Sequence, residues 1–271
     1  MKVLSIVGAR PQFVKLAPIS WAASGRVEHE TLHTGQHYDE LLSSNFFSEL
    51  QIPSPIKNLG IGSGTHGEQT GKMIIAIERA IHEIEPEHII LYGDTNSTLS
   101  GAIAATKMHI PISHVEAGLR SFNKLMPEEM NRILTDHASD LLFAPTVTAM
   151  SNLQKEGLGD KARFAGDVMV ETLRWIQKGA QKVDAPDQYI VATIHRAENT
   201  DNKSRLKFIL KQLKKSEIPV HLYCHPRLER LIKELDFGIA SEQLVLLPPI
   251  GYKEMVANVI NSVGVITDSG G

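Results

Sequence analysis

What this 271-residue sequence lacks already excludes several classes of protein. Its single cysteine, Cys224, rules out a disulfide within the chain and is typical of proteins from reducing compartments. No apolar run approaches the ~18–20 residues of a membrane-spanning helix. The formal net charge is only −3, so nothing indicates a nucleic-acid-binding or anionic-membrane surface. The sequence therefore predicts a cytosolic enzyme or binding protein.

Several motifs of metal and cofactor sites are also missing. The 12 histidines include His33 and His37 on either side of one predicted strand end, but neither H-E-x-x-H nor C-x-x-C occurs. The sequence has no G-x-G-x-x-G for a dinucleotide, no P-loop and no G-x-S-x-G nucleophile elbow. We therefore expect neither a metal nor a redox cofactor.

What is present is a regular alternation of short β-branched runs with amphipathic helical segments, as at residues 66–84. Such an alternation predicts an α/β fold with parallel sheets and helices on both faces. Residues 51–65, rich in proline and glycine, are expected to form a loop, and residues 38–50 a helix. The predicted strands are residues 3–7, 31–34, 88–92, 112–115, 140–144, 162–165, 189–194, 220–223, 244–247 and 263–266.

The polar segment 179–188 predicts a boundary between two domains, because domain linkers are typically polar and lack periodicity. We expect an N-terminal Rossmann-like domain over residues 1–180 and a C-terminal one over 187–271. The chain ends at Gly271, directly after a predicted strand, where Ser-Gly-Gly ordinarily opens a helix. We therefore expect the second domain to be incomplete and the chain to be a fragment.

Polar clusters follow the predicted strands directly, and in doubly wound folds ligands bind outside the carboxyl ends of the strands. Because both halves contribute clusters, the simplest geometry is two domains that face each other across a ligand-binding cleft. The clusters are Gly8-Ala9-Arg10, Gly35-Gln36-His37, Gly93-Asp94-Thr95, Glu116 to Arg120, His195 to Asn199, His225-Pro226-Arg227, Pro249 to Tyr252 and Ser269-Gly270-Gly271.

The densest group of charges lies in residues 110–132. Glu116 follows an apolar strand, where a carboxylate is unfavourable unless it is paired, so one interpretation is a salt bridge to Arg120 or Arg132. Glu128 and Glu129 begin a helix, where acidic side chains also favour the helix dipole. We favour the other interpretation, in which this segment moves protons on an anionic substrate.

Other polar residues have two interpretations each. Asp94 is either a functional carboxylate or the cap of the helix that follows it. His195 and Arg196 either face a diphosphate or form an exposed pair on a loop. The glycine clusters 8–10 and 269–271 are either phosphate-binding turns or simply tight turns between strand and helix.

Eight segments along the whole chain form a recognisable set: GARPQFVK (8–15), HTGQHYDE (33–40), YGDTNSTL (92–99), HVEAGLRSFN (114–123), MPEEMNR (126–132), HRAENTD (195–201), HPR (225–227) and TDSGG (267–271). Together they resemble the non-hydrolysing UDP-N-acetylglucosamine 2-epimerases. The resemblance implies two Rossmann-like domains in the GT-B arrangement, UDP-GlcNAc as substrate, UDP-ManNAc as product and usually a homodimer. Some variants also resemble the branch that acts on UDP-2,3-diacetamido-2,3-dideoxy-glucuronate.

The resemblance also implies roles for individual residues. Asp94, Glu116 and Glu128 would handle protons, with His195 counted among the catalytic residues. The hydrogen on carbon 2 is not acidic, so the chemistry is anti elimination of UDP to a 2-acetamidoglucal, followed by protonation of the other face and return of UDP. Neither metal nor redox cofactor is required. The substrate-binding residues would be Arg10, Lys15, Gln36, Arg132, Arg196, His225, Ser269, Gly270 and Gly271.

Three other functions stay open on the sequence alone. A GT-B glycosyltransferase would share the UDP-binding cleft but use an acceptor, and the acidic segment 110–132 argues against it. A non-catalytic UDP-sugar-binding fragment would bind the nucleotide without exchanging the carbon-2 hydrogen. An epimerase of the hydrolysing type would release free sugar and UDP.

Overall fold

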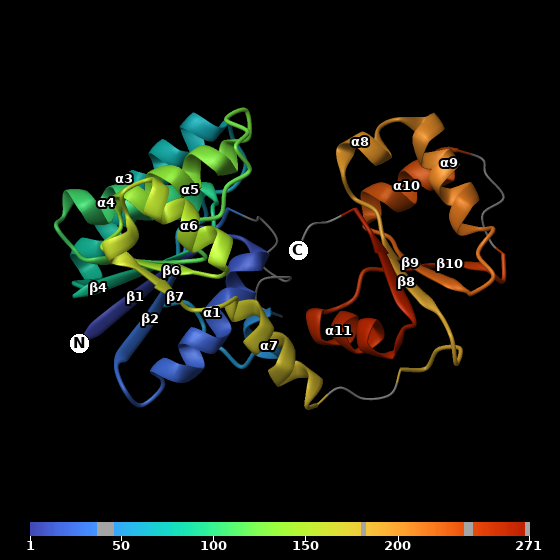
Figure 1. Cartoon of the computed structure of the whole chain (residues 1–271), viewed down its shortest axis with the longest axis horizontal. Coiled ribbons are helices and arrows are strands. Elements are labelled where there is room, and N and C mark those ends of the chain that lie inside the picture. The colour runs from blue at the N-terminus through green and yellow to red at the C-terminus, as the bar shows by residue number, and fades with distance from the viewer. Residues whose placement is uncertain (37–45, 180–182, 236–240, 269–271) are drawn as a thin grey trace. The chain divides into compact units, whose positions relative to one another are not determined.

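The structure, a computed structural model, describes residues 1–36, 46–179, 183–235 and 241–268. The chain divides into two compact units, Met1–Arg174 (unit 1) and Trp175–Gly271 (unit 2), each built on its own parallel sheet (Figure 1). The predicted domain boundary, between residues 180 and 187, lies partly outside the described residues and stays a prediction.

Unit 1 contains a seven-stranded sheet in the order β3-β2-β1-β4-β5-β6-β7, and every neighbouring pair is parallel. From β3 to β6 this is the strand order of doubly wound nucleotide-binding folds. The predicted α/β fold class is thus confirmed for this unit. The strands are β1 (Lys2–Val7), β2 (Glu28–His33), β3 (Lys57–Asn58), β4 (His88–Tyr92), β5 (Ile112–Val115), β6 (Leu141–Ala144) and β7 (Ala162–Phe164).

Helices cover both faces of this sheet, with α3, α4 and α5 on one face and α1 on the other (Figure 1). Each parallel connection must cross the sheet, and the helix in that connection buries its apolar stripe against the strands. The helices are α1 (Arg10–Ala23), α3 (His66–Ile84), α4 (Asn96–Lys107), α5 (Pro127–Ala138), α6 (Val147–Lys155), the 3₁₀ turn η1 (Gly159–Lys161) and α7 (Val168–Gln177), which ends in unit 2.

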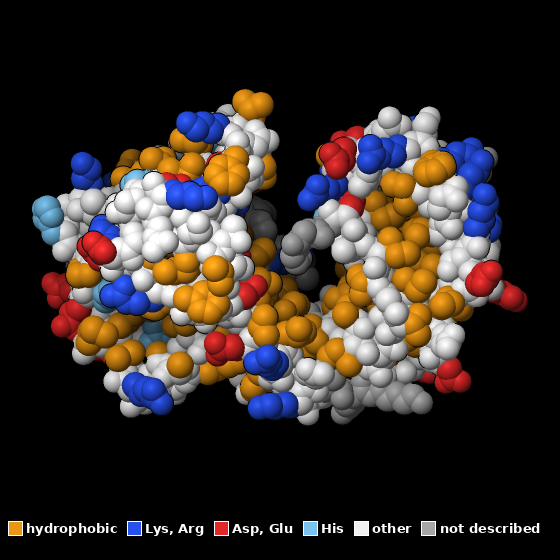
Figure 2. All heavy atoms as spheres, in the orientation of Figure 1, with side chains coloured by type: hydrophobic (Ala, Val, Ile, Leu, Met, Phe, Trp, Pro, Cys, Tyr) orange, Lys and Arg blue, Asp and Glu red, His pale blue; other side chains and the backbone are white. Residues whose placement is uncertain are grey.

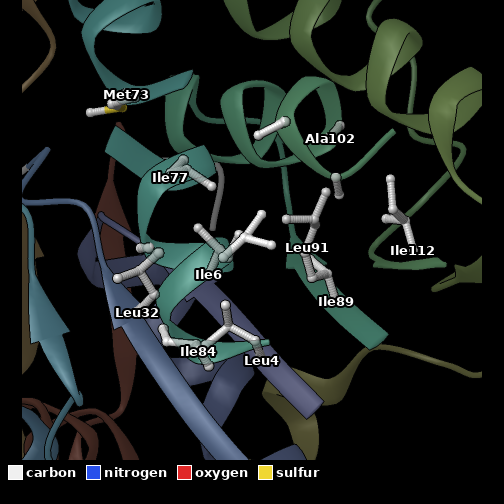
Figure 3. Close-up of a cluster of buried hydrophobic side chains, with 14 residues drawn as sticks. Leu4, Ile6, Leu32, Met73, Ile77, Ile84, Ile89, Leu91, Ala102 and Ile112 are labelled. Atoms are coloured by element: carbon white, nitrogen blue, oxygen red, sulfur yellow. The ribbon is translucent and has the colours of Figure 1, made fainter. Parts of the chain in front are cut away.

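The main core of unit 1 lies between the central strands and helices α3 and α4 (Figure 3). Ile6 of β1 and Leu91 of β4 are fully buried and point toward Ile77 of α3. Burial of each such side chain stabilises the fold by about 1.5–3 kcal/mol. A β-carbon on Gly101 of α4 would lie 2.6 Å from Leu91 Cδ2, so α4 approaches β4 very closely. This packing places the start of α4 beside the carboxyl end of β4.

Unit 2 repeats the same design with fewer strands. Its four-stranded parallel sheet has the order β10-β9-β8-β11, so β8 takes the central position that β1 has in unit 1. Helices α9 and α10 pack on one face and α11 on the other (Figure 1). The elements are β8 (Ile190–Thr193), α8 (Ala197–Thr200), α9 (Lys203–Leu213), β9 (Val220–Tyr223), α10 (Pro226–Glu234), β10 (Leu244–Leu247), α11 (Tyr252–Asn261) and β11 (Gly264–Thr267).

The structure corrects the predicted secondary structure in three places. The loop predicted over residues 51–65 contains the two-residue strand β3, which pairs with the end of β2. The sequence of β3 has no apolar alternation from which a strand could be predicted. Strand β2 begins at Glu28 rather than at residue 31, because its polar first half is only partly buried and shows no apolar pattern. The short helix α8 was not predicted at all. The helix predicted over residues 38–50 lies largely outside the described residues.

The surface has no dominant charge on the face shown in Figure 2, where acidic and basic side chains lie scattered over each unit. In the described part of the chain, no helix combines the length and the apolar character needed to cross a membrane.

Candidate active site

Both units have a topological switch point, where neighbouring strands continue in opposite directions across the sheet. In unit 1 it lies between β1 and β4, and in unit 2 between β8 and β11. Ligands of doubly wound folds bind in the crevice outside the carboxyl ends of these strands. The segments after these four strands contain Arg10, Asp94, His195 and Arg196, which the sequence singled out.

The turn after β1 is occupied by a side chain of the protein itself. Gly8 N and Ala9 N donate to Gln12 Oε1 at 2.7 and 3.0 Å, and Gln12 Nε2 donates to Tyr92 O at 2.8 Å. These amides do not face a phosphate, so the tight-turn interpretation is correct for Gly8 and Ala9. Buried Gln12 instead ties the end of β1 to the end of β4, while Arg10 begins α1 and is partly exposed.

Gln36, predicted to bind substrate, also makes contacts within unit 1. Its Oε1 accepts from Ser97 N at 3.1 Å and from Ser97 Oγ at 2.6 Å, in the first turn of α4. A β-carbon on Gly8 would lie about 2 Å from both Thr34 Oγ1 and Ser97 Oγ (2.1 and 2.2 Å). Only glycine fits at this position, where three segments meet beside the switch point.

Glu116 is paired with a cation that the sequence interpretation did not name. Lys15 Nζ of α1 lies 2.5 Å from Glu116 Oε2, and both side chains are largely buried. The alternative interpretation, a salt bridge from Glu116 to Arg120 or Arg132, is therefore wrong. Glu116 follows β5 with a φ of 74°, a conformation that costs free energy in a non-glycine residue. A β-carbon on Gly93 would lie 3.1 Å from Glu116 Oε2 and 3.3 Å from Lys15 Nζ, so this pair lies directly beside the end of β4.

Asp94 forms an ion pair with Arg132 of α5 and does not cap α4. The cap is its neighbour Thr95, whose side chain accepts a hydrogen bond from Thr98 N. The capping interpretation of Asp94 is therefore wrong. Arg132 Nη1 also lies 3.0 Å from Glu129 Oε2, so the guanidinium predicted to bind substrate holds two carboxylates.

The two acidic residues at the start of α5 differ in environment. Glu128 is exposed, whereas Glu129 is buried and accepts from Ser121 N at 2.9 Å and Phe122 N at 2.8 Å. Burial raises the pKa of Glu129, but these hydrogen bonds and Arg132 outweigh it and lower the pKa below its usual value. Glu129 thus organises the loop before α5 and leaves Glu128 at the surface.

A buried ionic network lies behind these residues, and sequence reasoning missed it. His114 Nδ1 lies 2.7 Å from Asp136 Oδ1, and Arg120 Nη2 lies 2.8 Å from Asp136 Oδ2. Arg120 also pairs with Glu156 through two hydrogen bonds of 2.8 and 2.7 Å. Burial raises the pKa of Asp136, but its contacts with His114 and Arg120 more than compensate and lower it. The one feature of the sequence that could have indicated this network was His114, a histidine within an otherwise uncharged strand.

In unit 2 a carboxylate directly after β11 organises the segment after β8. Asp268 accepts from His195 N and Arg196 N, each at 3.0 Å, and from Asn199 Nδ2 at 2.9 Å. Burial raises the pKa of Asp268, but these hydrogen bonds and the charge of His195 lower it overall. The backbone amides of His195 and Arg196 are thus occupied by Asp268, whereas their side chains are each at least half exposed, with His195 Nδ1 3.7 Å from Asp268 Oδ1. Asp268 was missed as a site residue, although it belongs to the TDSGG segment.

The remaining predicted site residues of unit 2 have separate places. His225 is the N-cap of α10, and its ring accepts weakly from Arg227 N at 3.4 Å. Ser269, Gly270 and Gly271 lie outside the described residues.

The fold thus brings together two sets of predicted residues, each beyond the carboxyl ends of the strands of one sheet. Unit 1 collects Lys15, Asp94, Glu116 and Arg132, and unit 2 collects His195 and Arg196 around Asp268. Within the residues that the structure describes, no group of three or more histidine, cysteine or acidic side chains is placed to hold a metal ion.

Comparison with known proteins identifies the family. Residues 20–271 match the family model "UDP-N-acetylglucosamine 2-epimerase". The chain is 46% identical over 283 residues to a UDP-N-acetylglucosamine 2-epimerase homolog of Methanococcus maripaludis, and 46% identical over 288 residues to the UDP-2,3-diacetamido-2,3-dideoxy-D-glucuronate 2-epimerase of Pseudomonas aeruginosa. Each alignment covers 100% of this chain and 79% of the relative.

A solved structure of the same family has the same fold. The Methanocaldococcus jannaschii UDP-GlcNAc 2-epimerase, in complex with UDP-GlcNAc and UDP, superposes with a TM-score of 0.87 at 41% identity. The superposition covers 100% of this chain and 79% of that one. The resemblance found in the sequence is confirmed, and this chain belongs to the UDP-N-acetylglucosamine 2-epimerase family.

Proposed function

We propose that this chain inverts carbon 2 of a UDP-2-acetamido sugar, converting UDP-GlcNAc to UDP-ManNAc. The observation that carries the proposal is the pair of carboxylates beyond the carboxyl ends of β4 and β5 in unit 1. Asp94 and Glu116 follow neighbouring strands, and each is held by one cation from a covering helix. Carboxylates held in this way are suited to proton transfer at a fixed place on a bound sugar.

The chemistry requires acid–base groups on both faces of the sugar. One carboxylate removes the proton from carbon 2 while the bond between carbon 1 and oxygen breaks, and its electron pair leaves with UDP. The product is a 2-acetamidoglucal. A proton then adds to the opposite face of carbon 2, and UDP returns to carbon 1. We assign proton transfer to Asp94, Glu116 and Glu128, whose exposed position at the start of α5 leaves its carboxylate accessible.

The departing diphosphate needs positive charge, which we assign to Arg10, His195, Arg196 and His225 and to the amides of residues 269–271. The exposed rings and guanidinium of unit 2 support this assignment, because their backbone amides are already held by Asp268. Lys15 and Arg132 position the carboxylates in this proposal, since their charges are already paired within unit 1.

The test is proton NMR of UDP-GlcNAc incubated with the chain in D₂O. Loss of the carbon-2 proton signal with growth of UDP-ManNAc is the expected result. Glu116→Gln or Glu128→Gln should reduce this exchange by about 10²–10⁴-fold, the usual contribution of one acid–base group, with UDP binding within a few-fold. Glu78→Gln, at an exposed position of α3, is the matched control.

Other outcomes of the same experiment identify other functions. UDP-ManNAc formation at the wild-type rate in both Gln variants contradicts the assignment of the carboxylates. Free sugar with UDP indicates the hydrolysing reaction, and binding without exchange indicates a non-catalytic UDP-sugar-binding protein. Turnover that requires an acceptor indicates a glycosyltransferase.

A second candidate substrate is UDP-2,3-diacetamido-2,3-dideoxy-glucuronate, because the Pseudomonas aeruginosa relative named for it is 46% identical to this chain. The reaction at carbon 2 is the same for both sugars. Running the exchange experiment with each sugar in turn distinguishes them by the ratio of their kcat/KM values.

We also propose a homodimer in the cytosol. An exposed apolar stripe supports self-association, since Met126 at the N-cap of α5 and Met130 and Leu134 within it recur every four residues and are 38%, 39% and 47% exposed. Sedimentation velocity should give a dimer mass for the wild type and a monomer mass for Met130→Glu. An unchanged dimer in the variant would place the interface elsewhere.

A further inference from the structure

The buried ring of His114 has hydrogen-bond acceptors at both of its nitrogens. Nδ1 lies 2.7 Å from Asp136 Oδ1, and Nε2 lies 2.7 Å from the carbonyl oxygen of Gly93. A backbone carbonyl can only accept a hydrogen bond, so Nε2 must carry a proton. The carboxylate of Asp136 is also an acceptor when it is ionised, so Nδ1 must then carry a second proton.

A neutral pair, with the proton on Asp136 rather than on Nδ1, fits the surroundings less well. Asp136 Oδ2 also receives the amide hydrogen of Gly118 at 3.0 Å and the guanidinium of Arg120 at 2.8 Å, and both favour the ionised carboxylate. An imidazolium at His114 also makes the network neutral, because two cations then face the two carboxylates of Asp136 and Glu156. The partly exposed ring of His137, 3.5 Å from Glu156, is the other titratable group in contact.

We propose that His114 is a positioning residue for the epimerase reaction, a buried imidazolium that fixes the end of β4 relative to the segment after β5. The proposal rests on the proposed function. The carbonyl that His114 holds belongs to the peptide between Gly93 and Asp94, so its Nε2 sets the direction in which Asp94 leaves the strand.

The same network fixes the segment that carries Glu116. Asp136 holds Gly118 N, and Asn152 Nδ2 holds Gly118 O at 3.0 Å, so the backbone two residues after Glu116 is bound on both sides. His114 therefore links the two carboxylate-bearing segments through contacts that are fully buried. Its two ring nitrogens bond to Asp136 and to the Gly93 carbonyl, so it acts on Asp94 and Glu116 through the backbone.

The first test measures the protonation of His114 directly. Long-range ¹H–¹⁵N spectra of the chain with ¹⁵N-labelled histidine, assigned with His114→Gln, should show both ring nitrogens of His114 protonated at pH 7. A bare ring nitrogen at that pH would overturn the imidazolium. This measurement uses the wild-type chain and needs no activity, so it stands apart from any failure of the proposed function.

The second test measures positioning. In His114→Gln and in Asp136→Asn, the backbone amide signals of Asp94, Thr95 and Gly118 should shift. The matched control is His88→Gln, which removes a bond of 2.8 Å to Ser113 Oγ between the same two strands at their other end. Unshifted signals at Asp94 and Gly118 in either variant would overturn the positioning role.

The third test separates positioning from folding. For a chain that exchanges the carbon-2 proton, His114→Gln should lower kcat by about 10²-fold, as expected for misplaced catalytic groups, with KM within a few-fold. His88→Gln should leave both constants unchanged. Wild-type kcat in His114→Gln would overturn the role, whereas absence of exchange in the wild type contradicts the proposed function and leaves the first two tests to decide on His114.

Discussion

The two units use the same device, a carboxylate that holds the segment after a strand, and place it in different surroundings. In unit 1, Asp136 of α5 accepts a hydrogen bond from Gly118 N, after β5. In unit 2, Asp268, directly after β11, accepts from His195 N and Arg196 N, after β8. Asp136 is completely buried among ionic partners, whereas Asp268 binds mainly amide groups and is partly exposed. Unit 1 therefore pairs its charges in the interior, and unit 2 leaves the side chains of His195 and Arg196 at least half exposed.

The two sheets also differ in burial, and the sheet of unit 1 is again the more buried. The central strands of unit 1 are covered on both faces, and Leu91 of β4 is fully buried. Strand β11, at one edge of the smaller sheet, keeps Val265 and Ile266 at 48% and 41% exposure. The comparison teaches that a similar strand order does not imply similar burial, because the number of covering elements sets how much of each strand is buried.

The largest expected effect concerns the two carboxylates. Asp136→Asn should destabilise unit 1 by about 3–5 kcal/mol, since it leaves buried cations without their partner. Asp268→Asn should cost unit 2 much less, because water can reach the freed amides. Urea unfolding followed by fluorescence separates the units, since the two tryptophans of the chain are Trp21 in unit 1 and Trp175 in unit 2. Equal losses in the two variants would remove the distinction between the units.

The next effect tests the two sheets. Leu91→Ala should cost about 2–5 kcal/mol, because it opens a cavity between β4 and α4. Ile266→Ala on β11 should cost less than about 1 kcal/mol, since that side chain remains partly in water. Denaturant midpoints of the two variants give the comparison. A loss of several kcal/mol for Ile266→Ala would show that β11 is covered in solution.

Low pH should destabilise both units by protonating Asp136 and Asp268. The pKa values of Asp136 and Asp268 are both lowered in the folded chain, so the stability that each contributes is present above the unfolded value of about 3.9 and is lost as pH falls through the folded value. Wild type and Asp136→Asn should therefore converge in free energy of unfolding between pH 7 and pH 2. A constant difference between them over that range would contradict the ionised state of Asp136.

The smallest effect concerns the helix caps. Thr95→Ala should destabilise α4 of unit 1 by about 1 kcal/mol, the typical value for a threonine N-cap. His225→Ala in α10 of unit 2 should cost only a few tenths of that amount, because the ring accepts a long hydrogen bond of 3.4 Å. Thermal unfolding measures both. A large loss for His225→Ala would show that this ring is needed for the helix.

The candidate site was predictable in its location and less so in its contacts. The rule that ligands bind beyond the carboxyl ends of parallel strands predicted that Asp94, Glu116 and His195 lie just after strands, and the structure has them there. The alternative interpretations of Asp94 as a cap and of Arg120 or Arg132 as the partner of Glu116 were wrong. Thr95 caps α4, and the partner of Glu116 is Lys15, which comes from a helix about a hundred positions earlier. Sequence distance carries no information about such a contact.

The sequence by itself determined the alternation of strands and helices, the parallel sheets and the family, because burial periodicity and short motifs are local properties of the chain. Only the tertiary structure decided which cation neutralises which carboxylate, that Gln12 occupies the turn after β1, and that His114 lies between two acceptors. These depend on how helices cross the sheet, where packing of the cores brings distant side chains within hydrogen-bond distance.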